Sequence, residues 1–201
     1  APALTIRGIV IIAILSVLVL VFFAPAQTVR LNWSMFFLGA GFMLLETKGV
    51  VHMALLFGST WTVNAIVFVA ILVMILLSNL FVLYFKPSRL TEYYVLLVLF
   101  LGLNAVVDLN SLLGLPQLLR ASISCLILFL PIFFAGVIFA VNFSRSANPD
   151  HDFGSNIAGA VLGGLAENLS LVLGFRYLML LAILFYVFAR GFQANLVPRG
   201  S

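Results

Sequence analysis

Residues 153–174 read FGSNIAGAVLGGLAENLSLVLG, an apolar stretch that is long enough to cross a lipid bilayer. On a helix, Ser155, Gly159 and Gly163 recur every four residues and form one stripe of small side chains, which Glu167 extends. Small residues let a neighbouring helix approach closely in lipid, and a carboxylate in the same row must face protein or water. We therefore expect this helix to be the centre of the fold, with its neighbours gathered around it.

The composition of the chain is that of a protein dissolved in lipid. Of the 201 residues, 64% are hydrophobic and 8% are charged, with a mean hydropathy of +1.27, whereas soluble domains carry about 25% charged residues. In lipid every backbone amide must be bonded within the protein, which leaves helices or closed barrels. The apolar runs show no alternation of period two, so we predict an all-α, polytopic helical bundle in the membrane.

The apolar runs predict about seven transmembrane helices in a single domain that covers residues 1–195. Their expected bounds are 6–24, 33–57, 61–85, 90–109, 118–142, 153–174 and 175–192. The turn Gly58-Ser59-Thr60 predicts that the second and third helices are antiparallel neighbours. Residues 46–49 (Glu-Thr-Lys-Gly) interrupt the second helix, which leaves three alternatives for it: a full crossing, a broken helix or a re-entrant one. The last six residues, 196–201, match the remnant of a thrombin-cleavable tag and are excluded.

Several polar residues are expected to end helices rather than to bind ligands. Asn32 is a predicted N-cap of the second helix, and Asp152 is a predicted cap of the sixth, after a polar loop over 144–152. Asp150-His151-Asp152 is interpreted as a solvated turn, because three consecutive loop residues rarely supply a full metal coordination shell. Cys125 is the single cysteine. We expect no metal and no cofactor.

Basic residues in the loops predict the orientation of the chain in the membrane. Five of them fall on one side of a seven-helix arrangement (Arg30, Lys86, Arg89, Arg145 and Arg190) and three on the other (Arg7, Arg120 and Arg176). Because positively charged loops favour the cytoplasm, the C-terminus is expected there. The net charge of +4 is spread over these loops and predicts no nucleic-acid surface.

Two parts of the chain resemble a known family. FMLLETKGV at 42–50 with LFGSTWTVN at 56–64, and GSNIAGAVLGGLAE at 154–167 with LGFRYL at 173–178, resemble the hydrophobic part of bacterial membrane-integrated spermidine-synthase-like proteins. The resemblance covers the second, third, sixth and seventh expected helices. It implies a helical module in the bacterial inner membrane, with a soluble aminopropyltransferase-like domain or a second copy of the chain as a partner.

The resemblance does not imply that this chain transfers aminopropyl groups. Such enzymes bind decarboxylated S-adenosylmethionine on a Rossmann-like domain, with a glycine-rich loop and paired acidic residues. Here Gly39-Ala40-Gly41 lies inside an apolar run rather than after a strand. The chain is therefore expected to be either the membrane part of a larger enzyme or a stand-alone relative of that part.

The candidate ligand-binding residues are the polar groups within the apolar runs: Glu46, Lys48, Asn64, Glu167 and Asn168. Intramembrane charges are costly and tend to be functional, but each also has a structural alternative. Glu46 and Lys48 can lie near an interface or pair with neighbouring helices. Glu167 can accept a hydrogen bond from Asn64 or Asn79, and Asn64 and Asn156 are expected to link helices.

Two functions stay open at this point. In the first, Glu46 and Glu167 converge, with Lys48 close by to neutralise one of them, and line a path for a cationic solute such as a polyamine. In the second, the chain is a structural or regulatory anchor for an aminopropyltransferase-like enzyme. No Ser-His-Asp set, HExxH motif or P-loop is present, so an intramembrane enzyme is the weakest hypothesis. A cavity lined by both carboxylates favours transport, and a dry, fully paired arrangement favours the anchor.

Overall fold

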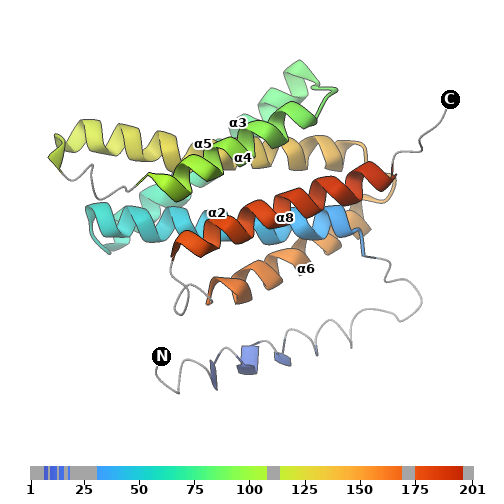
Figure 1. The fold of residues 1–201 in the computed structure, drawn as a ribbon, viewed down its shortest axis with the longest axis horizontal. Coiled ribbons are helices and arrows are strands. Elements are labelled where there is room, and N and C mark those ends of the chain that lie inside the picture. Colours follow the sequence, from blue (N-terminus) through green and yellow to red (C-terminus); the bar gives the residue numbers. More distant parts are fainter. Residues whose placement is uncertain are drawn as a thin grey trace.

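The computed structural model describes residues 31–107, 114–168 and 175–196, together with a few residues between 7 and 18. The described part is all-helical, as predicted (Figure 1). Its long helices are α2 (Trp33–Phe57), α3 (Trp61–Phe85), α4 (Thr91–Val106), α5 (Gln117–Ser144), α6 (Pro149–Glu167) and α8 (Phe175–Leu196). Most of the first expected span lies outside the described residues, and Asp108 and residues 169–174 lie outside them entirely.

Helix α2 is continuous, which corrects the predicted interruption at residues 46–49. All 25 residues from Trp33 to Phe57 are helical, including Gly49. Thr47 and Lys48 are buried and find hydrogen-bond partners on other helices. A polar segment therefore does not break the helix, because the surrounding bundle satisfies its side chains and the backbone keeps its own ladder of hydrogen bonds.

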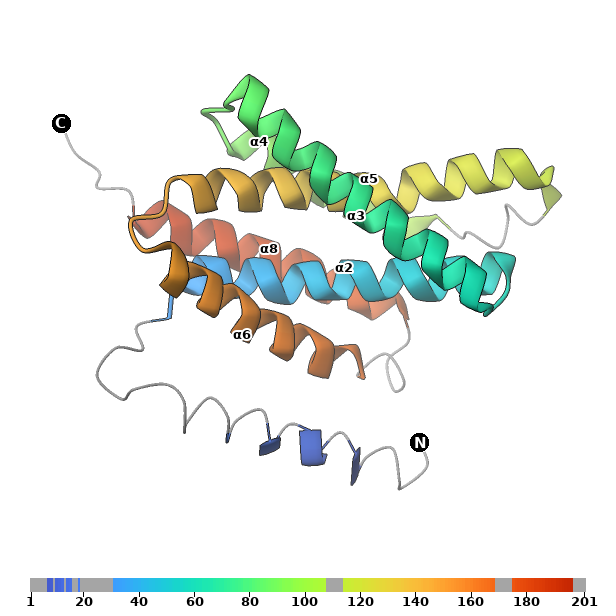
Figure 2. The same ribbon diagram turned by 180° about the vertical axis from the view of Figure 1, so that it is seen from behind.

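Successive helices run in alternating directions, so that chain neighbours are antiparallel (Figure 1, Figure 2). The turn between α2 and α3 occupies only residues 58–60. Gly58 ends α2 with a φ of 98°, a conformation that a residue with a side chain rarely adopts. Thr60 begins α3, because its hydroxyl accepts a hydrogen bond from the amide of Val63. The predicted hairpin is confirmed, although α3 diverges from α2 and packs mainly on α5 (Figure 2).

The central helix is α2, and not the helix that begins near Phe153. Helix α2 packs most extensively on α6 and α8 and also contacts α5 and α3, whereas α6 packs almost entirely on α2. Large side chains on the other face of α6 are exposed, among them Phe153 and Ile157. The prediction was wrong because a stripe of small residues on one face serves only one neighbour. Helix α2 instead buries residues around its whole circumference.

The predicted stripe on α6 is nevertheless the contact with α2. Ser155, Gly159 and Gly163 are all buried. A Cβ atom added to Gly159 would overlap the backbone carbonyl of Phe36, and one added to Gly163 would lie 2.5 Å from the carbonyl oxygen of Ala40. The two backbones therefore touch, which only small residues permit.

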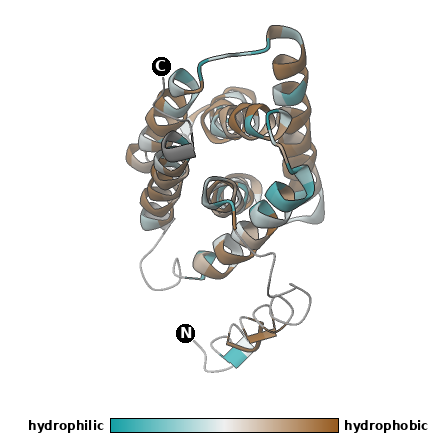
Figure 3. Cartoon of the chain, turned by 90° about the vertical axis from the view of Figure 1, so that its right-hand side faces the viewer, coloured by the Kyte–Doolittle hydropathy of each residue, from teal (hydrophilic) through white to brown (hydrophobic). Residues whose placement is uncertain are grey.

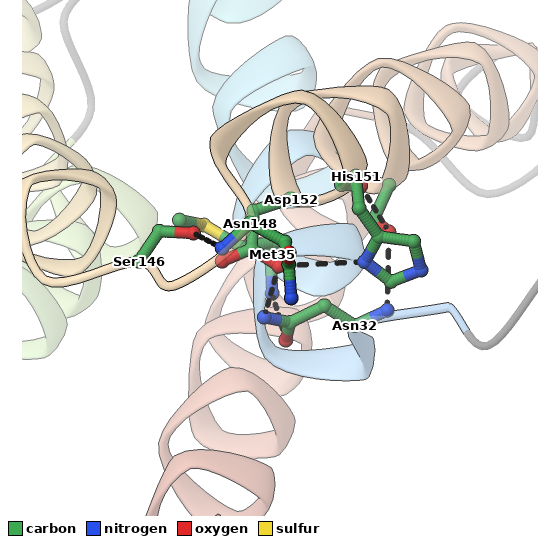
Figure 4. Close-up of polar contacts among 7 residues, drawn as sticks. Asn32, Met35, Ser146, Asn148, His151 and Asp152 are labelled. Atoms are coloured by element: carbon green, nitrogen blue, oxygen red, sulfur yellow. Dashed lines mark hydrogen bonds and ion pairs between the residues drawn. The ribbon is translucent and has the colours of Figure 1, made fainter.

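The first turns of α2 and α6 are joined by a hydrogen-bonded cluster (Figure 4). Asn32 caps α2 as predicted, since its Oδ1 accepts from the amide of Met35 at 3.3 Å. Its Nδ2 donates to Asp152 Oδ1 at 2.8 Å, and its backbone N–H donates to Ser155 Oγ at 3.0 Å. Asp152 does not cap α6, because that helix begins at Pro149, and the predicted polar loop over 144–152 shortens to residues 145–148.

Three described helices are long and apolar enough to cross a membrane: α2, α3 and residues 118–144 of α5. Helix α4 and residues 177–193 of α8 are shorter apolar helices. The described part of α6 is not among the candidates, which differs from the prediction, because it opens with Pro-Asp-His-Asp and contains four glycines. Helix α3 exposes most of its apolar residues, such as Leu72 at 63%. In the end-on view the helices are coloured mainly as hydrophobic (Figure 3).

One end of the bundle carries the loop after α3, the loop after α5 and the last turns of α8 (Figure 1). Arg145 donates from Nη2 to the carbonyl oxygen of Pro87 at 2.9 Å, and Arg190 donates from Nη2 to Thr91 Oγ1 at 2.8 Å. Arg145 and Arg190, two of the residues predicted to share one side of the membrane, thus contact the loop after α3 and the first residue of α4 at this end of the bundle. Arg120 lies at the other end of the bundle, with its guanidinium 5.0 Å from the ring centroid of Phe57.

The contact between α2 and α6 predicts opposite effects for two Gly→Ala substitutions on α6. Gly159→Ala should lower the free energy of unfolding by about 1–3 kcal/mol, because the methyl group would press on the backbone of Phe36. Gly154→Ala is the matched control. A Cβ at Gly154 meets nothing within 4 Å, so this variant should gain up to about 1 kcal/mol from helix propensity. Equilibrium unfolding in detergent measures both, and equal stability of the two variants would contradict this packing.

Candidate functional site

Two of the predicted site residues, Lys48 on α2 and Glu167 on α6, form structural contacts between helices. Thr47 Oγ1 donates to Glu167 Oε2 at 3.0 Å, which links α2 to α6. Lys48 is only 4% exposed, and its Nζ donates to the backbone carbonyl oxygen of Asn104 on α4 at 2.8 Å. Asn104 Nδ2 in turn donates to the carbonyl oxygens of Phe100 and Ile127 at 3.0 and 2.6 Å. The lysine therefore belongs to a connection between α2, α4 and α5.

The structure brings Glu167 beside α2 but does not join it to Lys48. Lys48 and Glu167 contact different helices, and the described residues contain no ion pair between Lys48 and either carboxylate. This corrects the expectation that Lys48 neutralises one of them. Glu46 is half-buried on the same turn of α2. The expected partners of Glu167 were Asn64 or Asn79, but the observed partner is Thr47, which sequence reasoning had passed over.

The predicted asparagines differ in their roles. Asn156 links helices as expected, since its Nδ2 donates to the carbonyl oxygen of Met35 at 3.0 Å. Asn168 ends α6, with its Nδ2 3.2 Å from the carbonyl oxygen of Leu165 in its own helix. Asn64 lies in the first turn of α3, and its Oδ1 is buried without a hydrogen-bond partner in the part of the chain that is described. Of these three asparagines, Asn156 is the one that bridges two helices within the described residues.

A further polar chain, which the sequence analysis missed, connects α5, α8 and α4. Gln193 Nε2 donates to Asn142 Oδ1, and Asn142 Nδ2 donates to the carbonyl oxygen of Ile138 at 3.0 Å. Arg190 Nη1 donates to Gln193 Oε1 at 3.4 Å, and its Nη2 reaches Thr91. Its guanidinium also lies 5.7 Å from the ring centroid of Tyr94. The sequence feature that could have predicted this polar chain is an amide side chain within an apolar run, such as that of Asn142.

A cavity of about 200 Å³ lies between α2, α3, α5, α6 and α8, and we call it the five-helix cavity. Its wall is mainly apolar and carries four polar side chains, from Ser78, Asn79, Asn156 and Tyr186. The other lining residues are Leu38, Phe42, Ile75, Ala135, Gly136, Phe139 and Phe153. Phe153 is 49% exposed, so the wall reaches the outer surface of the bundle beside α6. Neither Glu46 nor Glu167 lines this cavity.

Tyr186 is the most unusual group in the wall of the five-helix cavity. The side chain is fully buried, with its ring packed against Gly41. Its hydroxyl has no hydrogen-bond partner among the described residues. A buried phenol normally finds a partner, and leaving it without one costs about 1–3 kcal/mol. Ser78, also fully buried, uses its hydroxyl to donate to the carbonyl oxygen of Ile75 at 2.7 Å.

The chemistry of this cavity suits an uncharged guest. An apolar wall holds an apolar body, and a few placed amides and hydroxyls orient one polar group. A ring-sized apolar molecule already fits a cavity of about 150 Å³. Among the described residues, no group of three or more His, Cys, Asp and Glu side chains is placed to hold a metal ion. His151 and Asp152 form a close pair at 3.6 Å, which belongs to the cluster that joins α2 to α6 (Figure 4).

Comparison of the chain with protein-family models, with curated proteins and with solved structures returned no match. The resemblance to spermidine-synthase-like membrane proteins therefore stays a prediction from the sequence.

The contact between Thr47 and Glu167 predicts a coupled effect on stability. Thr47→Val keeps the shape of the side chain but removes the donor, and should cost about 1 kcal/mol of unfolding free energy. Glu167→Leu removes the acceptor and should cost a similar amount, and the double variant should cost less than the sum, because both changes remove the same interaction. A double-mutant cycle in detergent measures this coupling, with the exposed Thr62→Val as the control. Strict additivity would show that the contact contributes nothing.

Proposed function

We propose that this chain is an integral membrane module that binds a membrane-soluble, uncharged ligand in the five-helix cavity. The observation that carries the proposal is the cavity with Tyr186 in its lining, a residue whose hydroxyl is buried without a hydrogen-bond partner among the described residues. A ligand with one hydrogen-bonding group would supply the missing partner. Its apolar body would replace empty space beside Phe42 and Phe139, and the exposed edge at Phe153 gives it a way in from the bilayer.

A path for a cationic solute such as a polyamine is the weaker proposal. It requires Glu46 and Glu167 to line a polar space together. Glu167 instead accepts a hydrogen bond from Thr47 at an interface between helices, and the five-helix cavity contains neither carboxylate. An ammonium ion in this cavity would meet amides and hydroxyls but no counter-charge, and burying a charge without a partner is costly.

The structural anchor remains the second candidate function, and a specific observation favours it. The buried polar side chains of α2 are bonded within the bundle: Ser34 to the carbonyl oxygen of Ala189, Thr47 to Glu167, and Lys48 to Asn104. This paired arrangement holds the helices together without needing a substrate. An anchor for an aminopropyltransferase-like enzyme would use the same contacts, and the resemblance of the sequence is the reason to name that partner.

Photolabelling with an alkylphenol tests the ligand proposal. A 4-hexylphenol derivative that carries a diazirine should label residues of the five-helix cavity, because its ring fits the apolar space and its hydroxyl can bond to Tyr186 or Asn156. Ala135→Phe should abolish this labelling by filling the cavity. Tyr186→Phe should weaken binding by about 1 kcal/mol, or about fivefold, because only the hydroxyl is lost.

Val69→Phe is the control, since Val69 is 60% exposed on the lipid face of α3 and is not part of the cavity wall. Equal labelling of Ala135→Phe and Val69→Phe would contradict the ligand proposal and leave the anchor as the function. Competition of the label by spermidine would instead favour the cationic path.

A further inference from the structure

A second hollow lies on the surface between the C-terminal halves of α3 and α5. It has a volume of about 470 Å³, and its floor is formed by apolar side chains such as Val82, Leu83 and Val141. Two cationic residues, Lys86 and Arg145, line the same hollow, and no acidic residue does. We call it the α3–α5 groove. It is distinct from the five-helix cavity, with which it shares Asn79 as a lining residue.

The two cations of the groove lie where the membrane spans end. Lys86 directly follows the last residue of α3, and Arg145 directly follows the last residue of α5. Both helices are longer than the roughly 20 residues that cross the hydrocarbon core. In a bilayer that these helices cross, the basic groups would lie at the level of the lipid phosphates, and the apolar part of the groove would extend from them toward the hydrocarbon.

Both cations have donors to spare. Arg145 uses Nη2 for the carbonyl oxygens of Pro87 and Ser88, at 2.9 and 3.4 Å. A guanidinium has five N–H donors in a fork that matches a phosphate group. Lys86 is exposed, and in the described residues its ammonium group forms no hydrogen bond or ion pair. Glu92, Asp150 and Asp152 lie at the same end of the bundle, but none of them lines the groove.

The backbone conformation of Lys86 is a second reason to assign this residue a role in binding. Lys86 adopts a left-handed conformation with a φ of 45°, the one described residue other than glycine with a positive φ. Helices commonly end in this conformation with glycine or asparagine, because a Cβ atom is disfavoured there. A cation at a helix C-terminus also interacts favourably with the helix dipole. The dipole explains a basic residue on each helix, but not why both residues line one apolar groove.

We propose that the α3–α5 groove binds a phospholipid with an anionic headgroup. Lys86 and Arg145 hold the phosphate, and an acyl chain lies along the apolar floor between α3 and α5. Basic pockets between transmembrane helices are known to select anionic lipids in this way. The site would be on the side predicted to face the cytoplasm, where anionic lipid attracts positive groups. The proposal does not depend on the ligand of the five-helix cavity.

Native mass spectrometry of the detergent-solubilised chain tests this site with phosphatidylglycerol and phosphatidylcholine of identical acyl chains. The wild-type chain should bind phosphatidylglycerol more tightly. Lys86→Asn and Arg145→Gln should each weaken that binding about fivefold and reduce the preference over phosphatidylcholine. Lys86→Asn removes the charge while asparagine tolerates the left-handed backbone, so its melting temperature without lipid should equal or exceed that of the wild-type chain.

Arg89→Gln is the matched control, because it removes one positive charge from the same loop but does not line the groove. Ala140→Phe tests the apolar part, since it fills the groove without a change of charge, and should weaken both lipids. If one of these variants fails to fold, the remaining variants still test whether the groove binds the lipid. Equal losses in Arg89→Gln and Lys86→Asn would overturn the site. So would glycerol 3-phosphate that binds as tightly as the lipid, because the groove would then contribute nothing.

Discussion

The backbone contact between α2 and α6 is the constraint on which the rest of the bundle depends. Gly39 on α2 lies against the backbone of Asn156, and Gly159 on α6 lies against the backbone of Phe36. Each helix therefore provides a glycine that lets the other backbone approach closely. Helices do not gain from the hydrophobic effect when they leave lipid, so close packing of this kind drives their association. With α6 seated on one face, the other faces of α2 are covered by α8, α5 and α3.

Much of this fold could be predicted from the sequence because long apolar runs, bounded by capping and turn residues, indicate helices of the observed length. The bounds of α3, the cap at Asn32 and the stripe on α6 follow from apolar length, capping chemistry and spacing. The choice of the central helix could not be predicted in this way. A stripe such as Ser155 to Gly163 is visible in one helix alone, whereas the burial of α2 on all sides emerges only from the assembled bundle. The continuity of α2 through Lys48 likewise depends on Asn104, which is 56 residues away along the chain.

The candidate sites show the same limit. Charged residues stand out in an apolar chain, but in the structure Lys48 and Glu167 bond to neighbouring helices. The five-helix cavity is built from a few residues of each of five helices, and its polar members lie within apolar runs, as Tyr186 does. No spacing rule joins residues from separate helices. What identifies them is the shared empty volume and a hydroxyl without a partner, and both of these are properties of the packed bundle.

The central claim is that α2 is enclosed on all sides by protein, and a scan of spin-label accessibility to oxygen tests it most directly. With Cys125 replaced, single labelled cysteines would be placed along residues 35–49 of α2 and 66–80 of α3, in protein reconstituted into lipid. The account predicts low oxygen accessibility along α2 with no helical period, because buried residues occur around its circumference. On α3 the accessibility should rise every three to four residues, since only Val67, Ile71 and Ser78 are buried there. A periodic lipid-facing stripe on α2 as strong as that on α3 would contradict the account.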